Sequence, residues 1–550
     1  MLCAGNDEND VTAELDQCSV REMTRTTRKL ASERHDFIQL LNVCTEKKDL
    51  YCGMQLHVDI VNRGLLVEEN GTISLANKLI HMYARCGEMA KAQNIHDDMV
   101  VRNVISWNAL ISGYVQQGKS HKALDCLLLM QCEGLSPDAF TFSCILKACG
   151  CVEDVEKGKG IHRDIVKRGL LQGNIVLGTA LVDMYAKCGN LSKAQQLHVN
   201  LCAQDVVAWN ALIAGHVKHG HGHEALNCFE KLKCEGMFPD AFTFTCILKA
   251  CGSTRAVNKG ETVHIEIISS GLIKENIVLG NALVDMYSKC GAHAKAQQAH
   301  DELPFRNNAC WNSLIAGYAQ EQKDCEAMNC FKKMKDEGVS PDAITFACIL
   351  KVCGNMGAIT EGKQIHDEIV CRNMLKNHIA LGNALVDMYA KCGMITRAQQ
   401  VHNKFNIRNI ISWNALIAGY VRQGQGHEAL GCFERMKGEG LSPNAISFTS
   451  ILNACGSTRS LKKGKHIHEE IMNRGLLEKD LVLGSALMDM YTKCGWLSIG
   501  QEIFSRLRNR SLVSWTALIA GYAKHGHGEK ALYCFEYMQS HDVSPHSPVC

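Results

Sequence analysis

Apolar residues recur at helical spacing along one stretch near the start of the chain. The first set falls at positions i, i+3, i+4 and i+7: Trp107, Leu110, Ile111 and Tyr114. Gly118 interrupts the pattern, the same spacing returns over residues 123–130, and Gly134 and Pro137 then favour a turn. The stretch therefore predicts two short helices in a hairpin. Because neither helix can bury its apolar stripe alone, such hairpins must stack on neighbours.

The whole pattern returns every 102 residues without slipping. The tryptophan that opens it is Trp107, Trp209, Trp311, Trp413 and Trp515. A tyrosine keeps the same step as Tyr83, Tyr185, Tyr287, Tyr389 and Tyr491, and a histidine keeps it as His162, His264, His366 and His468. Self-similarity at a fixed period indicates a repeat architecture. With only 7 prolines, five of which close the hairpins, the sequence predicts an all-α solenoid.

Each 102-residue step divides into three hairpins of 35, 36 and 31 residues, for example 206–240, 241–276 and 277–307. They carry WNALIAGH, FTFTCILKACG and NALVDMYSKCG in turn. These units resemble the P, L and S units of pentatricopeptide repeat proteins of the plant PLS subclass. The resemblance covers nearly the whole chain and implies a right-handed α-solenoid superhelix of about fifteen helix-turn-helix repeats.

The resemblance also sets the expected domain organisation. A leader over 1–33, disordered or part of a targeting segment, precedes an array over 34–546, and a tail over 547–550 follows it. The expected units are L 34–72, S 73–103, P 104–138, L 139–174, S 175–205, P 206–240, L 241–276, S 277–307, P 308–342, L 343–378, S 379–409, P 410–444, L 445–480, S 481–511 and P 512–546.

The leader begins with an acidic stretch, whereas transit peptides are poor in acidic residues. A basic, threonine-rich stretch follows at 21–29. The family resemblance, and not this leader, implies a mitochondrial or plastid location. No run approaches the roughly 18 apolar residues of a membrane span, so we expect no membrane partner.

The chain has 29 cysteines but no CxxC spacing, so the usual zinc signature is missing. Fifteen of them recur at three repeat positions on or beside the apolar stripes, where a free thiol packs as a small hydrophobe. The three sets are Cys44/149/251/353/455, Cys86/188/290/392/494 and Cys126/228/330/432/534. We predict reduced packing residues, and neither a metal nor another cofactor.

Relatives in this family often carry a cytidine-deaminase-like domain, which needs an HxE pair and a downstream PCxxC. HxE recurs at one L-unit position, as His264–Glu266, His366–Glu368 and His468–Glu470. No CxxC follows, so the sequence predicts no deaminase, no enzyme activity and no small-molecule substrate.

Three histidines, His219, His221 and His223, form another metal candidate. A matching P unit has Gln423 and Gln425 at the first two positions, so a solvated turn is favoured over a metal site.

The resemblance implies that each hairpin addresses about one RNA base. We call the fifth residue of a unit, which follows the tryptophan in P units, the reading residue, and the last residue of that unit its partner. The P-unit pairs are Asn108/Asp138, Asn210/Asp240, Asn312/Asp342, Asn414/Asn444 and Thr516/His546. The S-unit pairs are Asn77/Asn103, Thr179/Asp205, Asn281/Asn307, Asn383/Asn409 and Ser485/Ser511. The family's pairing rules imply U for Asn with Asp, C or U for Asn with Asn, and G for Thr with Asp. The pairs Thr516/His546, Ser485/Ser511 and the L-unit pair Ala347/His378 fit no such rule.

Two structural alternatives stand beside this interpretation. Asn and Asp also cap helices and fill turns, which is a serious alternative for the partner residues after proline. It is weaker for an Asn inside WNALI, because Asn is a poor former of helix interiors. Ile105, Val207, Ile411 and Val513 resemble the family's stacking wedges between bases, and ordinary packing between helices explains each of them as well.

A basic side chain follows the reading residue by eight positions, slightly more than two helical turns, and is expected to contact RNA phosphates. These residues are Arg85, Lys187, Lys289, Lys391 and Lys493 in S units and Lys218, Arg422 and Lys524 in P units. The charge near a helix C-terminus also favours cations by itself. Overall, 59 basic and 57 acidic residues exclude a general polycationic nucleic-acid binder.

The sequence therefore predicts a protein that binds single-stranded RNA sequence-specifically and recognises sites for organellar C-to-U editing. Its expected partners are RNA, editing cofactors and a deaminase supplied in trans. Two alternatives remain, a factor that stabilises or processes organellar transcripts, and a TPR-like scaffold for other proteins. TPR units keep a uniform length of about 34 residues, so the alternation of 35, 36 and 31 favours RNA.

Overall fold

A computed structural model describes residues 33–66, 72–201, 205–273, 276–376, 378–405, 408–477, 480–507 and 512–540. The predicted leader, apart from residue 33, the tail, and the partner residues Ser511 and His546 lie outside these ranges. The described residues are helical with turns between the helices, and no strand occurs among them. The predicted all-α fold class is confirmed.

Each predicted unit holds two successive helices. The first helix of the first unit lies within the helical residues 33–47. The other first helices are α3 (Thr72–Cys86), α5 (Val104–Gln116), α7 (Ala139–Val152), α9 (Ile175–Lys187), α11 (Val206–Lys218), α13 (Ala241–Thr254), α15 (Ile277–Lys289), α17 (Asn308–Gln320), α19 (Ala343–Met356), α21 (Ile379–Lys391), α23 (Ile410–Arg422), α25 (Ala445–Ser457), α27 (Leu481–Lys493) and α29 (Leu512–Lys524).

The second helices are α2 (Leu50–Asn62), α4 (Met89–Asp98), α6 (Ser120–Cys132), α8 (Val155–Lys167), α10 (Leu191–Asn200), α12 (Gly222–Cys234), α14 (Val257–Ser269), α16 (His293–Asp301), α18 (Asp324–Asp336), α20 (Ile359–Cys371), α22 (Ile395–Asn403), α24 (Gly426–Gly438), α26 (Leu461–Asn473), α28 (Leu497–Arg506) and α30 (Gly528–Ser540). A short 3₁₀ turn, η1 (Met374–Lys376), follows α20.

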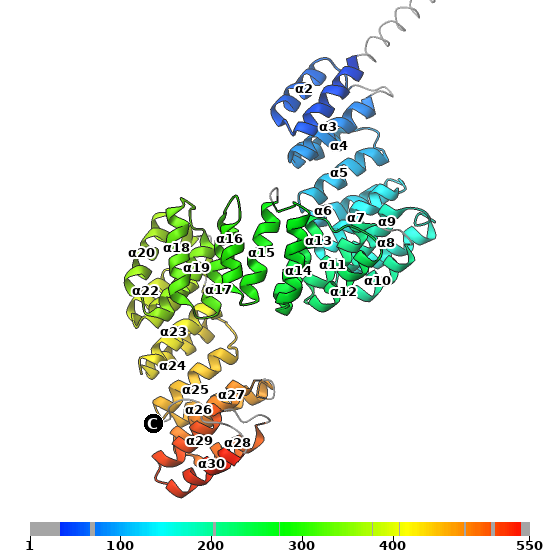
Figure 1. Cartoon of the computed structure of the whole chain (residues 1–550). Helices are drawn as coiled ribbons and strands as arrows, with labels where there is room; N and C mark the ends of the chain where they lie inside the picture. The colour runs from blue at the N-terminus through cyan, green and yellow to red at the C-terminus, as the bar shows by residue number, and fades with distance from the viewer. Residues whose placement is uncertain are drawn as a thin grey trace, which may run out of the picture. The chain divides into compact units, whose positions relative to one another are not determined.

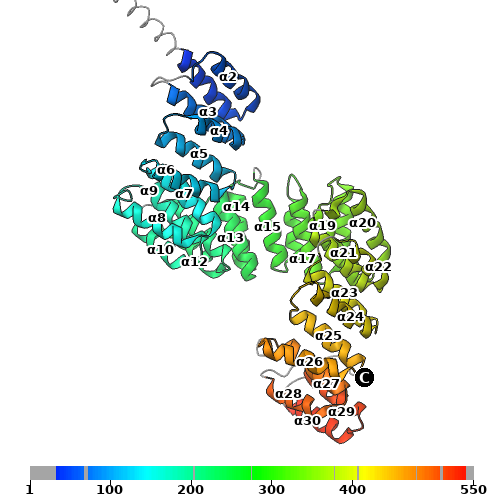
Figure 2. The same cartoon turned by 180° about the vertical axis from the view of Figure 1, so that it is seen from behind.

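The chain forms two compact parts, residues 1–272 and 273–550. Within the first part, the first helices contact one another in series from α3 to α13, and Figure 1 shows the hairpins stacked in chain order. Each second helix packs on its own first helix and on the first helix that follows. The second part repeats this from α15 to α29, as the reverse view in Figure 2 also shows. The first helices therefore form one continuous layer in each part.

Close approach within this layer requires glycine. A Cβ built on Gly215 of α11 would lie 2.6 Å from the Cβ of Ala186 on α9, closer than real side chains come. Gly118, predicted to end a helix, has a φ of 71° after α5, so the left-handed conformation is confirmed.

The repeated cysteines pack as predicted. Cys149 and Cys228 are buried and Cys188 is half-buried, and the described cysteines are free thiols. Burial raises the pKa of the Cys149 thiol to about 12, so it stays protonated at neutral pH.

A buried aromatic contact recurs where each S unit meets the next P unit. His402 is fully buried with its ring edge-on to Trp413, and the ring centroids lie 4.4 Å apart. The same contact recurs as His96–Trp107, His198–Trp209 and His300–Trp311. At the fifth junction Phe504 takes the histidine position and lies 4.5 Å from Trp515. A phenyl ring therefore fits this site.

We expect this contact to make stability depend on pH. Burial lowers the pKa of His402 from 6.5 to about 4. Below pH 6.5, His402 therefore binds a proton in the unfolded chain that it does not bind in the folded chain. Stability should fall as the pH drops from about 6.5 towards 4. When the pH is lowered from about 7 to about 5, the melting temperature of the variant His402→Phe should fall by less than that of the parent.

The matched control is His427→Asn, because His427 is exposed and makes no such contact. It should show the parent's pH dependence. Equal losses of melting temperature in His402→Phe and the parent would contradict the assignment.

Candidate nucleic-acid interface

Four of the five predicted P-unit pairs lie in direct contact, and the fifth includes His546, outside the described residues. Asn210 sits in the first turns of α11, and Asp240 is the N-cap residue of α13. The Asn210 Nδ2 donates to the two carboxylate oxygens of Asp240 at 3.2 and 3.1 Å. The same bond joins Asn108 to Asp138, Asn312 to Asp342, and Asn414 to Asn444, at 3.1–3.2 Å. Residues 30 positions apart are thus brought side by side four times.

A third residue, which the sequence analysis missed, completes each P-unit pair. The Thr243 hydroxyl, from the following L unit, lies 2.5 Å from the Oδ1 of Asn210 and donates to it. Its counterparts lie at 2.6–2.7 Å from the other reading residues: Thr141 with Asn108, Thr345 with Asn312, and Ser447 with Asn414. The signal in the sequence was a Ser or Thr three residues after each partner, the capping-box position.

The acidic partners are held as carboxylates. Burial alone would raise the pKa of Asp138, but the hydrogen bonds from Thr141 and Asn108 outweigh it, and the pKa lies below its usual value. The pKa of Asp342 is lowered by the same balance, with Thr345 and Asn312 as donors. Each of these P units therefore places a negative charge beside its reading amide at neutral pH.

S-unit pairs are held less tightly. The Thr179 hydroxyl donates to Asp205 at 3.1 Å, and the Asn77 Nδ2 reaches the Oδ1 of Asn103 at 3.4 Å. The side-chain oxygens of Asn77 and Asn281 are buried without a hydrogen-bond partner. Asn383 is likewise a buried reading residue.

The capping alternative is correct for the partner residues, though it leaves the reading residues unexplained. Each of these partners accepts a hydrogen bond from the first turn of the following helix: Asn103, Asp138, Asp205, Asp240, Asn307, Asp342, Asn409 and Asn444. Of the pairs outside the pairing rules, His378 precedes α21 without such a bond, and Thr516 donates to the Val513 carbonyl at 3.0 Å.

The packing alternative for the wedge residues is wrong. Ile105, Val207, Ile411 and Val513 are 60–67% exposed, so they do not pack between helices. The same second position of other units also carries a more than half-exposed apolar residue, which the sequence analysis missed: Phe140, Val176, Phe242, Val278, Ile344, Ile446 and Val482. The first helices thus present a recurring apolar side chain three positions before the reading residue.

The predicted basic residues are present, but many already form ion pairs. Each S-unit lysine bonds an aspartate four residues earlier, at 2.6–2.7 Å: Lys187 with Asp183, Lys289 with Asp285, Lys391 with Asp387, and Lys493 with Asp489. Lys218 lies 2.7 Å from Glu153. Among the described residues, Arg85, Arg422 and Lys524 form no ion pair.

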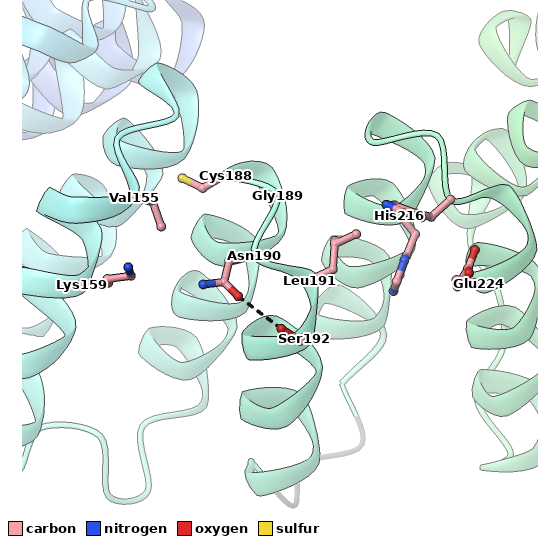
Figure 3. Close-up of a pocket in the computed structure, with 10 residues that line it drawn as sticks. Val155, Lys159, Cys188, Gly189, Asn190, Leu191, Ser192, His216 and Glu224 are labelled. Atoms are coloured by element: carbon pink, nitrogen blue, oxygen red, sulfur yellow. Dashed lines mark hydrogen bonds between the residues drawn. The ribbon is translucent and has the colours of Figure 1, made fainter.

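The histidine cluster makes different contacts from those a metal site requires. His219 caps α11 and its Nε2 lies 3.2 Å from the Lys187 carbonyl oxygen, while His221 and His223 are exposed. Nearby, His216 stands where the other P units have tyrosine, and the shorter side chain borders an open cavity of about 470 Å³ (Figure 3). No group of His, Cys, Asp and Glu side chains in the described ranges is placed to hold a metal ion. Nor is any helix of those ranges long and apolar enough to cross a membrane.

Comparisons with known proteins agree with this geometry. Profiles described as "PPR repeat family" and "PPR repeat" match residues 102–151, 204–253, 306–355 and 408–457, and residues 75–104 and 513–543, respectively. A chloroplastic pentatricopeptide repeat-containing protein of Arabidopsis thaliana is 32% identical over 89% of this chain and 78% of its own length. The chain belongs to the pentatricopeptide repeat family.

Other relatives in this family include a mitochondrial pentatricopeptide repeat-containing protein of Arabidopsis thaliana, 33% identical over 85% of this chain and 45% of its own length. The crystal structure of the pentatricopeptide repeat protein PPR10 from maize has a TM-score of 0.56 at 17% identity, covering 93% of this chain and 89% of PPR10. The fold is therefore that of the family's solenoid. PPR10 in complex with an 18-nt psaJ RNA element has a TM-score of 0.50 at 18% identity, covering 92% of this chain and 87% of PPR10.

Proposed function

We propose that the chain binds single-stranded RNA sequence-specifically, about one base per hairpin, and recognises sites for C-to-U editing in a mitochondrion or plastid. The observation that carries this proposal is the repeated contact between a reading residue and its partner along the layer of first helices. A scaffold for proteins has no need of an amide beside a carboxylate in three P units, and beside a second amide in a fourth, always at the same place in the unit.

The chemistry of the P-unit site suits a pyrimidine. Asn210 uses one N–H towards Asp240 and one oxygen lone pair towards Thr243, which leaves one N–H and one lone pair for a ligand. Uracil offers an adjacent N3–H donor and carbonyl acceptor to match them. The nearby carboxylate favours that N3–H over the N3 lone pair of cytosine. Asn444 carries no charge, so the Asn414 site accepts either pyrimidine.

The exposed apolar side chains supply the second part of the site. Val207 lies three residues before Asn210 on α11, so it is close to any base that Asn210 binds. Bases stack on apolar and aromatic side chains with little sequence preference. We infer that these residues hold the faces of the bases while the amides bind their edges.

The basic residues supply the third part. Ion pairs that water still reaches, such as half-buried Lys187–Asp183, contribute little stability, so RNA phosphates can compete with the aspartates for the lysines. The phosphate contribution to affinity is therefore smaller than a count of lysines suggests.

The organellar location and the editing role rest on the relatives and on unit lengths. Relatives named as chloroplastic and mitochondrial support an organelle, and the maize structure with bound RNA supports an RNA ligand. The alternation of 35, 36 and 31 residues, which resembles the PLS subclass, supports editing. We propose editing cofactors and a deaminase supplied in trans as the further partners.

The phosphate contacts can be tested with substitutions of opposite sign. Replacing Lys187, Lys289 and Lys391 with Gln should weaken binding to every RNA and reduce the salt dependence by roughly 0.7 in slope for each lost phosphate contact. Replacing their partners Asp183, Asp285 and Asp387 with Asn should instead strengthen binding, because it frees the same lysines. Affinity is measured by fluorescence anisotropy at several salt concentrations. Unchanged affinity in both triple variants would remove these lysines from the RNA site.

The base-reading proposal is tested by changing one pair. Sequencing RNAs that the parent selects from a random pool should reveal a preferred sequence, with U at the base assigned to Asn210 and Asp240. Asn210→Thr recreates the Thr179/Asp205 pair, in which the hydroxyl bonds the carboxylate, and should move that one base towards G. Readout of one base is worth about 1–3 kcal/mol, so the shift should be roughly tenfold.

The neighbouring base assigned to Thr179 serves as the internal control and should not change. If Asn210 is only a packing residue, the variant should bind all sequences uniformly worse, without a shift at any base. A parent that selects no ordered sequence would overturn the proposed function altogether.

A further inference from the structure

We propose that the hydroxyl of each following L unit, Thr141, Thr243, Thr345 or Ser447, is a positioning residue that sets base specificity in the preceding P unit. The inference rests on the proposed function and deepens it. It gives the L units a part in recognition: a P unit distinguishes its base only as well as the next L unit holds the reading amide.

The contact is short, buried and repeated. The four hydroxyls are fully buried and lie 2.5–2.7 Å from the Oδ1 of the reading asparagines. A fully buried hydroxyl is costly unless it is hydrogen-bonded, and here it has partners in both the reading and the partner residue.

The hydroxyl proton has one preferred destination. The Oδ1 of Asp240 already accepts the Thr243 backbone N–H at 2.7 Å and the Asn210 amide at 3.2 Å. The Oδ1 of Asn210 lies closer to the hydroxyl, at 2.5 Å compared with 2.8 Å for Asp240. The proton therefore goes to Asn210.

Together, Asp240 and Thr243 select one orientation of the Asn210 amide. Turning the amide over would place its oxygen against the Asp240 carboxylate and its NH₂ group against the hydroxyl. It would also exchange the donor and the acceptor that face the base, and so change which base edge fits. An amide held in one orientation distinguishes U from C more sharply than one that turns.

S units provide a contrast within the same chain. The residue at the corresponding place is Ser412 after the pair Asn383/Asn409, and its hydroxyl donates to the Asn409 backbone carbonyl at 2.9 Å. Ala208 follows Thr179/Asp205 and has no hydroxyl at all. Asn77, in an S unit, has a buried oxygen without a partner. Among the described residues, the S units of Asn77, Thr179 and Asn383 thus lack the contact that orients the P-unit amides.

A purely structural role must be separated from positioning. Thr243 also completes a capping box with Asp240, so its loss weakens the start of α13. Ser412 completes the same capping box with Asn409 at the start of α23. The variant Ser412→Ala therefore removes an equivalent capping hydroxyl that has no bond to a reading residue.

The test uses the full chain with Thr243→Val, Thr243→Ser and Ser412→Ala. Affinity is measured for the RNA that the parent selects, for copies with C in place of U at the base assigned to Asn210, and for copies with a purine in place of the pyrimidine at the base assigned to Asn383. Thr243→Val should reduce the U-over-C preference at that base about fivefold, the worth of one hydrogen bond, and leave other bases alone. Thr243→Ser should keep the preference. Ser412→Ala should leave discrimination unchanged at the bases assigned to Asn210 and Asn383, while lowering the melting temperature about as much as Thr243→Val.

A uniform loss of affinity in Thr243→Val, with the U-over-C ratio retained, would overturn the positioning role and leave the proposed function standing. Equal loss of discrimination in Ser412→Ala at the base assigned to Asn383 would also overturn it, because capping alone would then explain the effect. A parent without any base preference would overturn both the proposed function and this inference.

Discussion

The helix N-cap at each P–L junction joins folding to recognition. Asp240 accepts the Thr243 backbone N–H at 2.7 Å, which starts α13, and the same carboxylate holds the Asn210 amide. An N-cap hydrogen bond is worth about 1 kcal/mol. A P unit therefore cannot change its acidic partner residue freely, because losing the acid also weakens the next helix. Replacing the acid with Asn, as at Asn444, costs the least stability, because the amide oxygen of Asn444 still caps α25. The exchange removes only the charge beside Asn414.

Close packing of the first helices gives these caps their regular place. Gly215 on α11 lies against Ala186 on α9 so tightly that a methyl group would not fit. The ring contact of half-buried His198 with buried Trp209 joins the same two units through α10 and α11. Such contacts recur at the S–P junctions, so reading residues one round of three hairpins apart occupy equivalent positions on their helices. A binding layer built this way takes its spacing from the core.

The fixed 102-residue step of the sequence predicts the helices and their order. The pairing of residues 30 positions apart was predicted from the family resemblance. The sequence could not predict the hydrogen bond from Thr243 to Asn210, because the capping box alone explains a threonine three residues after an acidic N-cap. It also left the role of Val207 open, because an apolar residue on a helix suits a buried face as well as an exposed one, and only its 62% exposure decides. The phosphate contacts of the lysines stay a prediction, and the pairing of Lys187 with Asp183, and of its equivalents, was seen only in the i, i+4 geometry of the folded helix.

In the proposed function, the near balance of charge affects how the chain recognises RNA. With 59 basic and 57 acidic residues, and with S-unit lysines held by aspartates, attraction to the phosphate backbone is modest. Non-specific nucleic-acid binding comes almost entirely from that attraction. A chain with little attraction to the phosphates depends on contacts to the bases for its affinity. It therefore binds other sequences weakly and is more selective. For that reason the rigidity of the reading amides, which the caps and buried hydroxyls provide, matters more here than in a strongly basic protein.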